Sequence, residues 1–219
     1  MLMLCLSDVQ GNLDALRAVL ATAERKSFQK LIICGDILFP GPQPLETWRR
    51  LTASGALLVQ GLGDKAVATI EPAELIATSP HEAGRIEQLR KTQRELGDII
   101  LERLRRLPSQ VRIPLEDGRE LLVCHGSPAD PSEAMTFDMS DEELDALLVD
   151  DPADVIVCGM SHVPFDRTVG EVRIINVGSV GDAPDGKPSA DAPPQVAHAT
   201  WIDSTPTGLY IEQIAVPLV

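Results

Sequence analysis

The first six residues of the chain constrain its fold most strongly, because Met1–Leu6 is apolar at every position. An apolar run without alternation predicts a β-strand that is buried on both faces. The run is followed by Asp8 and by Asn12, a good N-cap, and apolar residues then recur at helical spacing over 13–25. A second buried strand is expected at Lys30–Cys34, which is apolar after its first residue. This β–α–β order predicts a parallel strand pair with a right-handed crossover, and hence an α/β fold.

The rest of the chain continues this mixture of strands and helices. We expect further strands at Ala56–Gln60, Val111–Leu115, Glu120–Cys124, Val155–Cys158, Glu171–Val177, His198–Asp203 and Leu209–Val216. We expect helices at Leu45–Ala53, at His81–Leu107 and, after a capping box at Ser140, through Leu148. Residues 65–80 indicate short helix and loop, and residues 178–195 indicate a polar, exposed loop. Since no stretch resembles an interdomain linker, we expect one domain over residues 1–219.

The charge of the chain bounds its partners. A formal net charge of -14 argues against non-specific binding to nucleic acid or to an anionic membrane. The N-terminal apolar run is too short for a signal peptide or a membrane span. We therefore expect a cytoplasmic protein.

The four cysteines are Cys5, Cys34, Cys124 and Cys158, and each lies in an apolar run shortly before a polar loop. Because the chain is neither small nor visibly secreted, we interpret them as reduced, buried side chains near strand ends. A thiolate metal site is the alternative, and the lack of CxxC spacing argues against it.

The feature that carries chemistry is a polar residue in the loop after each of five predicted strands: Asp8, Asp36, Asp64, His125 and His162. A single aspartate in such a position is usually a turn residue. Five such endings, each with glycine nearby, instead predict a shared site at the strand ends. Carboxylates mixed with imidazoles suit a transition metal better than calcium, which prefers oxygen ligands alone.

In these motifs the chain resembles the calcineurin-like metallophosphoesterases, specifically their small bacterial and archaeal branch. The family pattern is D-x-H, G-D, G-N-H/C-D, H-G and G-H-x-H. The matching segments here are Asp8-Val9-Gln10, Gly35-Asp36, Gly61-Leu62-Gly63-Asp64, His125-Gly126-Ser127-Pro128 and Gly159-Met160-Ser161-His162. The resemblance implies a four-layer α/β/β/α sandwich with two mixed sheets. It also implies two metal ions at the strand ends that hold a phosphate group for attack by hydroxide.

The resemblance also assigns roles to individual positions. Asp36 would bridge the two ions, one of which would take Asp8, the residue at position 10 and His162. The other ion would take His125 and the residues at positions 62 and 160. Asp36 and His125 are accordingly the candidate catalytic residues, and a phosphate-containing small molecule is the expected substrate.

Three departures from the family pattern weaken this site. Gln10 replaces a histidine, Leu62 an asparagine and Met160 a histidine. Leucine cannot bind a metal, and a thioether is a poor ligand for such ions. We therefore expect at most one divalent ion, Mn, Fe, Ni or Zn, held by Asp8, Gln10, Asp36 and His162, whereas the second position keeps only Asp36 and His125. Gly63 stands where some members carry a histidine, which leaves Asp64 with no histidine to orient.

Two hypotheses remain open from the sequence. In one, a single metal supports slow or specialised hydrolysis of a phosphomonoester or phosphodiester. In the other, the fold is kept without catalysis, as a ligand-binding, interaction or regulatory module. The remaining histidines, His81 and His198, are expected to be structural, and the sequence specifies neither substrate nor oligomeric state.

Overall fold

Ten strands form two five-stranded sheets in the computed structural model, which describes residues 1–149, 153–184, 187, 189, 192 and 194–218. The first sheet has the order β10 (Gly208–Pro217), β9 (Val196–Thr205), β1 (Leu2–Leu6), β2 (Lys30–Ile33) and β3 (Leu57–Leu58). The second has the order β4 (Gln110–Pro114), β5 (Glu120–Cys124), β6 (Val155–Cys158), β8 (Val172–Asn176) and β7 (Phe165–Val169). Both sheets are mixed. Strands β1–β2–β3 and β5–β6–β8 are parallel, whereas β9, β10, β4 and β7 pair antiparallel.

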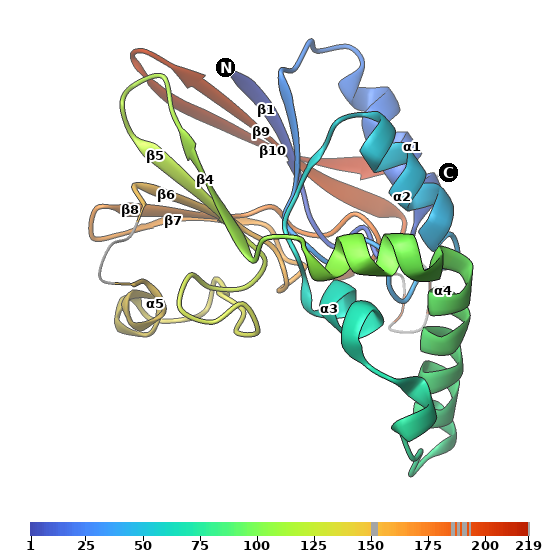
Figure 1. The fold of residues 1–219 in the computed structure, drawn as a ribbon. Helices are drawn as coiled ribbons and strands as arrows, with labels where there is room; N and C mark the ends of the chain where they lie inside the picture. The colour runs from blue at the N-terminus through green and yellow to red at the C-terminus, as the bar shows by residue number, and fades with distance from the viewer. Residues whose placement is uncertain (150–152, 185–186, 188, 190–191, 193, 219) are drawn as a thin grey trace.

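The helices enclose the two sheets, as Figure 1 shows. One side carries α1 (Leu13–Ala23), α2 (Pro44–Ala53), α3 (Leu62–Thr69), the short 3-10 helix η1 (Pro72–Glu74) and α4 (Pro80–Arg105), and the other carries α5 (Asp141–Leu147). Three apolar cores lie between these layers: helices against the first sheet, sheet against sheet, and the second sheet against α5. The predicted four-layer sandwich is therefore confirmed.

Strand β1 shows why an uninterrupted apolar run was needed. Leu4 and Leu6 face the core beneath the helices, whereas Met3 and Cys5 face the core between the sheets. Successive side chains of a strand point to opposite faces, so a central strand in this sandwich must be apolar at every position. Met3, Leu4, Cys5 and Leu6 are all fully buried.

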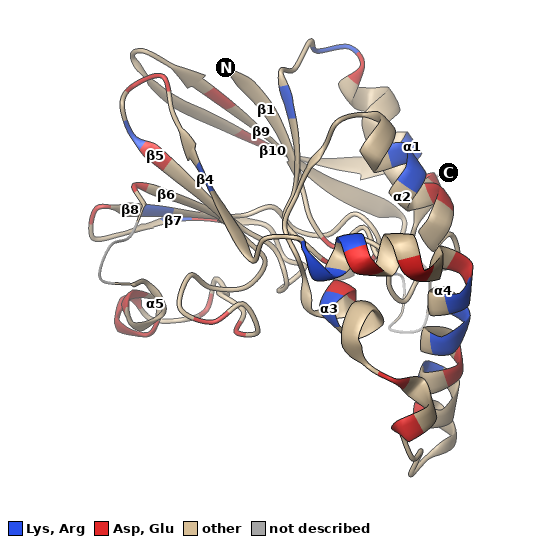
Figure 2. Ribbon diagram, viewed as in Figure 1, with Lys and Arg blue, Asp and Glu red and all other residues tan. Residues whose placement is uncertain are grey.

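The helix boundaries follow local signals in the sequence. The side chain of Asn12 accepts a hydrogen bond from the Ala15 N–H (3.1 Å), which caps α1, and the capping box at Ser140 opens α5 as predicted. The long helix α4 is interrupted at Gly97, whose φ of 69° and ψ of 168° are not helical. Its charge-rich sequence is mainly a solvated surface (Figure 2).

Three expectations about local structure were wrong. Strand β7 was not predicted, because Phe165–Val169 has three polar residues between its apolar ends, as an edge strand can. Strand β3 has only two residues, since the chain leaves the sheet early to begin α3. The loop that starts at residue 178 is not exposed there: Ser179 and Val180 are fully buried. Residues 185–186, 188, 190–191 and 193 of that loop lie outside the described residues.

All four cysteines are free and buried, as expected. Burial raises the pKa of the Cys5 thiol and raises that of Cys124 to about 12, so these thiols stay protonated and act as small apolar side chains. Within the described part of the chain, no helix combines the length and the apolar character that a bilayer crossing needs.

Candidate metal centre

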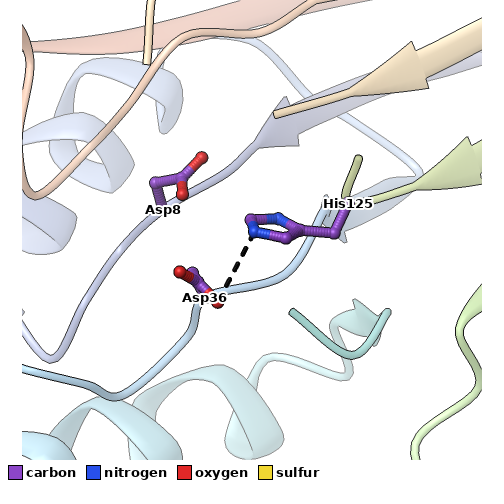
Figure 3. Close-up of side chains that lie close together, drawn as sticks. All are labelled: Asp8, Asp36 and His125. Carbon is purple, nitrogen blue, oxygen red and sulfur yellow. Dashed lines mark ion pairs between the residues drawn. The ribbon is translucent and has the colours of Figure 1, made fainter. Parts of the chain in front are cut away.

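The loops after β1, β2 and β5 bring Asp8, Asp36 and His125 together (Figure 3). One potential ligand atom of each residue lies within 4.8 Å of those of the other two. Since β1 and β2 are parallel, their carboxyl ends meet at one edge of the first sheet, and β5 supplies the histidine from the second sheet. The site therefore lies where the ends of the two sheets converge.

The backbone at this edge is strained. Among the described residues, the non-glycine residues with positive φ all lie in the loops after β1, β2 and β6: Asp8, Gln10, Asp36, Met160 and His162, with φ between 48° and 66°. This conformation costs roughly 1 kcal/mol or more for an ordinary residue. Strain of this kind gathers at functional sites, because the surrounding structure must hold the side chains in a required direction. Sequence reasoning could not foresee it.

Two glycines allow the close packing around the cluster. Gly35 has a φ of 93°, and a Cβ there would lie 2.6 Å from Nδ1 of His125. A Cβ on Gly61 would lie 2.1 Å from the backbone nitrogen of Asp36 and 2.3 Å from its Oδ1. Such distances are not possible between real atoms, so both positions require glycine.

His125 is oriented with one ring nitrogen toward the cluster. Its Nδ1 lies 2.7 Å from the carbonyl oxygen of Cys34, which can only accept, so Nδ1 carries the hydrogen. In the neutral ring Nε2 is then an unprotonated acceptor that can bind a metal. Nε2 is buried, lies 3.5 Å from Asp36 Oδ1 and has no hydrogen-bond partner among the described residues.

Asp8 presents a second buried atom without a hydrogen bond. Its Oδ2 accepts a hydrogen bond from the Met160 N–H (3.0 Å), but Oδ1 has no hydrogen bond of good geometry within the described structure. Leaving a buried polar group unsatisfied costs about 1–3 kcal/mol. Asp8 Oδ1 and His125 Nε2 are thus two such groups that converge with Asp36, which fits a cation between them.

Asp36 lies closest to the opening of the site. Its Oδ1 accepts a short hydrogen bond from the Gly63 N–H (2.6 Å). Burial, opposed by His125 and reinforced by the charge of Asp8, raises the pKa of the Asp36 carboxyl. Two carboxylates this close in a buried place repel each other, and a divalent cation would relieve that repulsion.

His162 and Gln10 lie on the Asp8 side of the cluster. His162 Nε2 is 3.2 Å from Asp8 Oδ1 and 3.3 Å from Gln10 Nε2, and its Nδ1 is 3.5 Å from Asp182 Oδ2. Burial disfavours the imidazolium, but the contact with Asp8 and the charges of Asp182 and Asp36 outweigh it and raise the pKa of His162. His162 is therefore held between two carboxylates.

Three further motif residues, Met160, Leu62 and Asp64, are not placed as metal ligands. Met160 contributes its backbone N–H to Asp8, and Leu62, partly exposed, begins α3 at the rim of the site. Asp64 is fully buried, and its two oxygens accept hydrogen bonds from the N–H groups of Ile37 (2.9 Å) and Gly61 (3.0 Å). Asp64 thus connects the start of α3 to the Asp36 loop.

The segment after β8 holds the Asp8 loop in place. The backbone N–H of Gly181 (2.8 Å) and the hydroxyl of Ser179 (3.1 Å) both donate to the carbonyl of Asp8. The side chain of Asn176 donates to the carbonyl of Gly159 (2.5 Å) in the loop that carries His162. His198 supports this segment, because its Nδ1 accepts from the Ser179 N–H (3.3 Å). His198 is thus a buried structural residue, in line with the prediction.

A cavity of about 610 Å³ opens over the cluster. It is lined by Gln10, Asp36, Phe39, Pro40, Leu62, Gly63, Ala66, His81, Arg85 and Asp182. Sequence reasoning missed Asp182, because it lay in a loop that was expected to be exposed, and Arg85, because it looked like one of many surface charges on α4. His81, expected to be structural, is exposed and borders the cavity.

The model of the calcineurin-like phosphoesterase superfamily domain matches residues 1–193. The chain belongs to this superfamily. The phosphoesterase match covers all the strand-end residues described above, and the family binds divalent metals and acts on phosphoesters.

Individual relatives agree with the family assignment. An uncharacterized protein from Methanocaldococcus jannaschii is 27% identical over 198 residues, which are 83% of this chain and 76% of that protein. The crystal structure of a hypothetical protein from Pyrococcus horikoshii OT3 matches 100% of this chain and 88% of its own, with 20% identity and a TM-score of 0.80. A metallophosphoesterase from Sphaerobacter thermophilus matches 100% and 89%, with 23% identity and a TM-score of 0.77. Because both identities are below 25%, these two structures show the fold of this chain and nothing of its activity.

Proposed function

We propose that this phosphoesterase-family chain hydrolyses a phosphomonoester or phosphodiester, slowly, with a single divalent transition-metal ion. The observation that carries the proposal is the convergence of Asp8 Oδ1, Asp36 and His125 Nε2, two of whose atoms are buried without a hydrogen bond. Two carboxylates and an imidazole are a suitable donor set for Mn, Fe, Ni or Zn. His162 and Gln10, on the Asp8 side, are the candidates to complete the ligand set.

Each residue has a definable task in this proposal. Asp8, Asp36 and His125 hold the ion, and the Cys34 carbonyl fixes the ring of His125. The ion would polarise a phosphoryl oxygen and activate water. Asp182 holds His162 toward the cluster. The cavity over Asp36 gives a phosphate-bearing substrate access from solvent.

The slow hydrolysis and the single metal ion in this proposal follow from Leu62 and Met160. The carbon side chain of Leu62 lines the cavity where a second ion would need a ligand, and Met160 serves through its backbone. Because His125 would bind the first ion through its one free ring nitrogen, a second ion would keep only the carboxylate of Asp36, which is too few ligands for tight binding. These residues also favour the second candidate function, a catalytically inactive family member that binds a phosphate ligand or a protein partner.

Hydrolysis of p-nitrophenyl phosphate and bis-p-nitrophenyl phosphate with Mn²⁺ tests the proposal. We expect slow turnover that chelator abolishes and that Asp36→Asn and His125→Ala reduce at least a hundredfold. Asp98→Asn is the matched control, because Asp98 is an exposed carboxylate on α4 outside the cavity over the cluster, and it should retain wild-type turnover. Equal background rates in the wild type and Asp36→Asn would instead support the inactive, ligand-binding alternative.

A further inference from the structure

One wall of the cavity over the metal centre is made by the first half of α4. His81 and Arg85 both line it, as does the cluster residue Asp36. They are four residues apart on one helix, so their side chains leave the same face, one turn apart. The remaining wall is largely apolar and comes from Phe39, Pro40, Leu62 and Ala66.

The helix that presents these two side chains is anchored beside the site. Gln88, one turn after Arg85, donates from Nε2 to the carbonyl of Pro40 (3.1 Å), which itself lines the cavity. Gln93 donates from Nε2 to the carbonyls of Val67 (2.9 Å) and Ile70 (2.8 Å) at the end of α3. Leu89 is buried in the core beneath. Arg85 therefore projects from a helix that is anchored beside the cavity.

Arg85 differs from Arg90 and Arg94, which follow it on α4. Arg90 and Arg94 both form ion pairs with Glu87 (2.8 Å and 3.1 Å). Within the described residues Arg85 has no ion pair and no side-chain hydrogen bond. Figure 2 shows both acidic and basic residues along α4, so carboxylates are present on the helix and yet none in the described structure pairs with Arg85. A guanidinium offers paired N–H donors that match a phosphate group.

We infer that Arg85 and His81 form a second anion-binding subsite, which takes a second phosphate group on the leaving-group side of the substrate. The inference rests on the proposed function, since it places the reacting phosphate at Asp8, Asp36 and His125. Water adds to that phosphorus, the bond from phosphorus to the leaving oxygen breaks, and the leaving oxygen takes a proton. The leaving group departs with the second phosphate, so Arg85 and His81 act in binding and not in bond breaking.

The cavity is large enough for such a substrate. A volume of about 610 Å³ lies within the usual range for small-ligand sites, roughly 300–1,000 Å³. Asp36 of the cluster and the two basic side chains border the same space, so one molecule can reach both. The substrate class is therefore a phosphoester that carries a further phosphate group, and a simple monophosphate would use only half of the site.

Calorimetric titration with two unreactive probes tests the inference. Mn²⁺-loaded full-length protein is titrated with n-propylphosphonate and with 1,3-propanediphosphonate, which differ by one anionic group. We expect the diphosphonate to bind at least tenfold more tightly to the wild type. Arg85→Gln should remove about tenfold of its affinity and leave that of propylphosphonate unchanged, and His81→Asn should give a smaller loss of the same kind.

Arg103→Gln is the matched control, because Arg103 is an exposed arginine of the same helix beyond Gly97 and does not line the cavity. It should leave both affinities unchanged. Equal binding of the two probes to the wild type, or equal losses in Arg85→Gln and Arg103→Gln, would overturn the inference. If the protein binds no Mn²⁺, the proposed function fails, and the same titrations on that protein still decide: an Arg85-dependent preference for the diphosphonate supports the subsite and its absence overturns it.

Discussion

Asp64 is the residue whose role changed most between sequence and structure. Its motif position suggested a partner for a histidine that the chain lacks. The structure gives it a different task, since its buried carboxyl accepts hydrogen bonds from the backbone N–H groups of Ile37 and Gly61. Burial, with the charge of Asp36 as the next cause, raises the pKa of Asp64 to about 7.

This pKa makes a prediction for the stability of the metal-free protein. Between about pH 4, its ordinary pKa, and pH 7, the folded chain keeps the proton on Asp64 whereas the unfolded chain has lost it. The stabilising effect of that proton is present at low pH and lost as pH rises through 7. Asp64→Asn cannot titrate, so the free energy of unfolding of the wild type minus that of the variant should fall by a few kcal/mol from pH 5 to pH 8. Urea unfolding with chelator measures it, and a difference that is flat with pH would count against the assigned pKa.

Helix α3 begins beside the Asp36 loop, and this close approach requires glycine at position 61. A side chain there would collide with the backbone nitrogen and Oδ1 of Asp36. Gly61→Ala should therefore destabilise the protein by about 2–3 kcal/mol and weaken metal binding, because the Asp36 loop must move. Gly84→Ala is the control: nothing lies within 4 Å of its added Cβ, and alanine in the exposed helix α4 should stabilise by about 0.5–1 kcal/mol. Thermal unfolding and metal titration of both variants check this pair, and similar changes in both would contradict it.

Buried strands and their ends were the elements that the sequence predicted best. Continuous apolar runs located β1, β2 and β6, because a strand with a packed layer on each face has no polar position to confuse the pattern. The edge strand β7 has only two buried residues and gave no such signal. Residues 178–180 were misjudged because their composition is that of an exposed loop, whereas the structure buries them against the Asp8 loop, with which this segment forms hydrogen bonds.

At the scale of the whole molecule, the convergence of the candidate site residues was predictable and their surroundings were not. The strand order places Asp8, Asp36 and His125 at one edge once the parallel pairs are known. Two features of the site depend on tertiary structure alone. One is the strained backbone of the strand-end loops, and the other is the position of Arg85 at the cavity, on a helix more than forty residues after Asp36. No periodicity encodes either.

The whole scaffold also predicts the result of restoring the family residues. The triple variant Gln10→His, Leu62→Asn and Met160→His supplies imidazole and amide ligands at the three departures from the family pattern. We expect it to bind a second metal ion per chain, because Asp36 is already in position to bridge two ions and the three new side chains add ligands to those of His125 and His162. Elemental analysis of the variant checks this, with each single substitution as a control that should stay at one ion. A triple variant that folds and still binds one ion would show that other residues limit the second position.

The most direct test of the central claim is the metal content of the wild-type chain after growth with Mn²⁺ and Zn²⁺ and purification without chelator. The arrangement of Asp8, Asp36 and His125 predicts one equivalent of divalent transition metal per chain, and less than a tenth of that in Asp36→Asn. Two equivalents in the wild type, no bound metal, or a full equivalent retained by Asp36→Asn would contradict it.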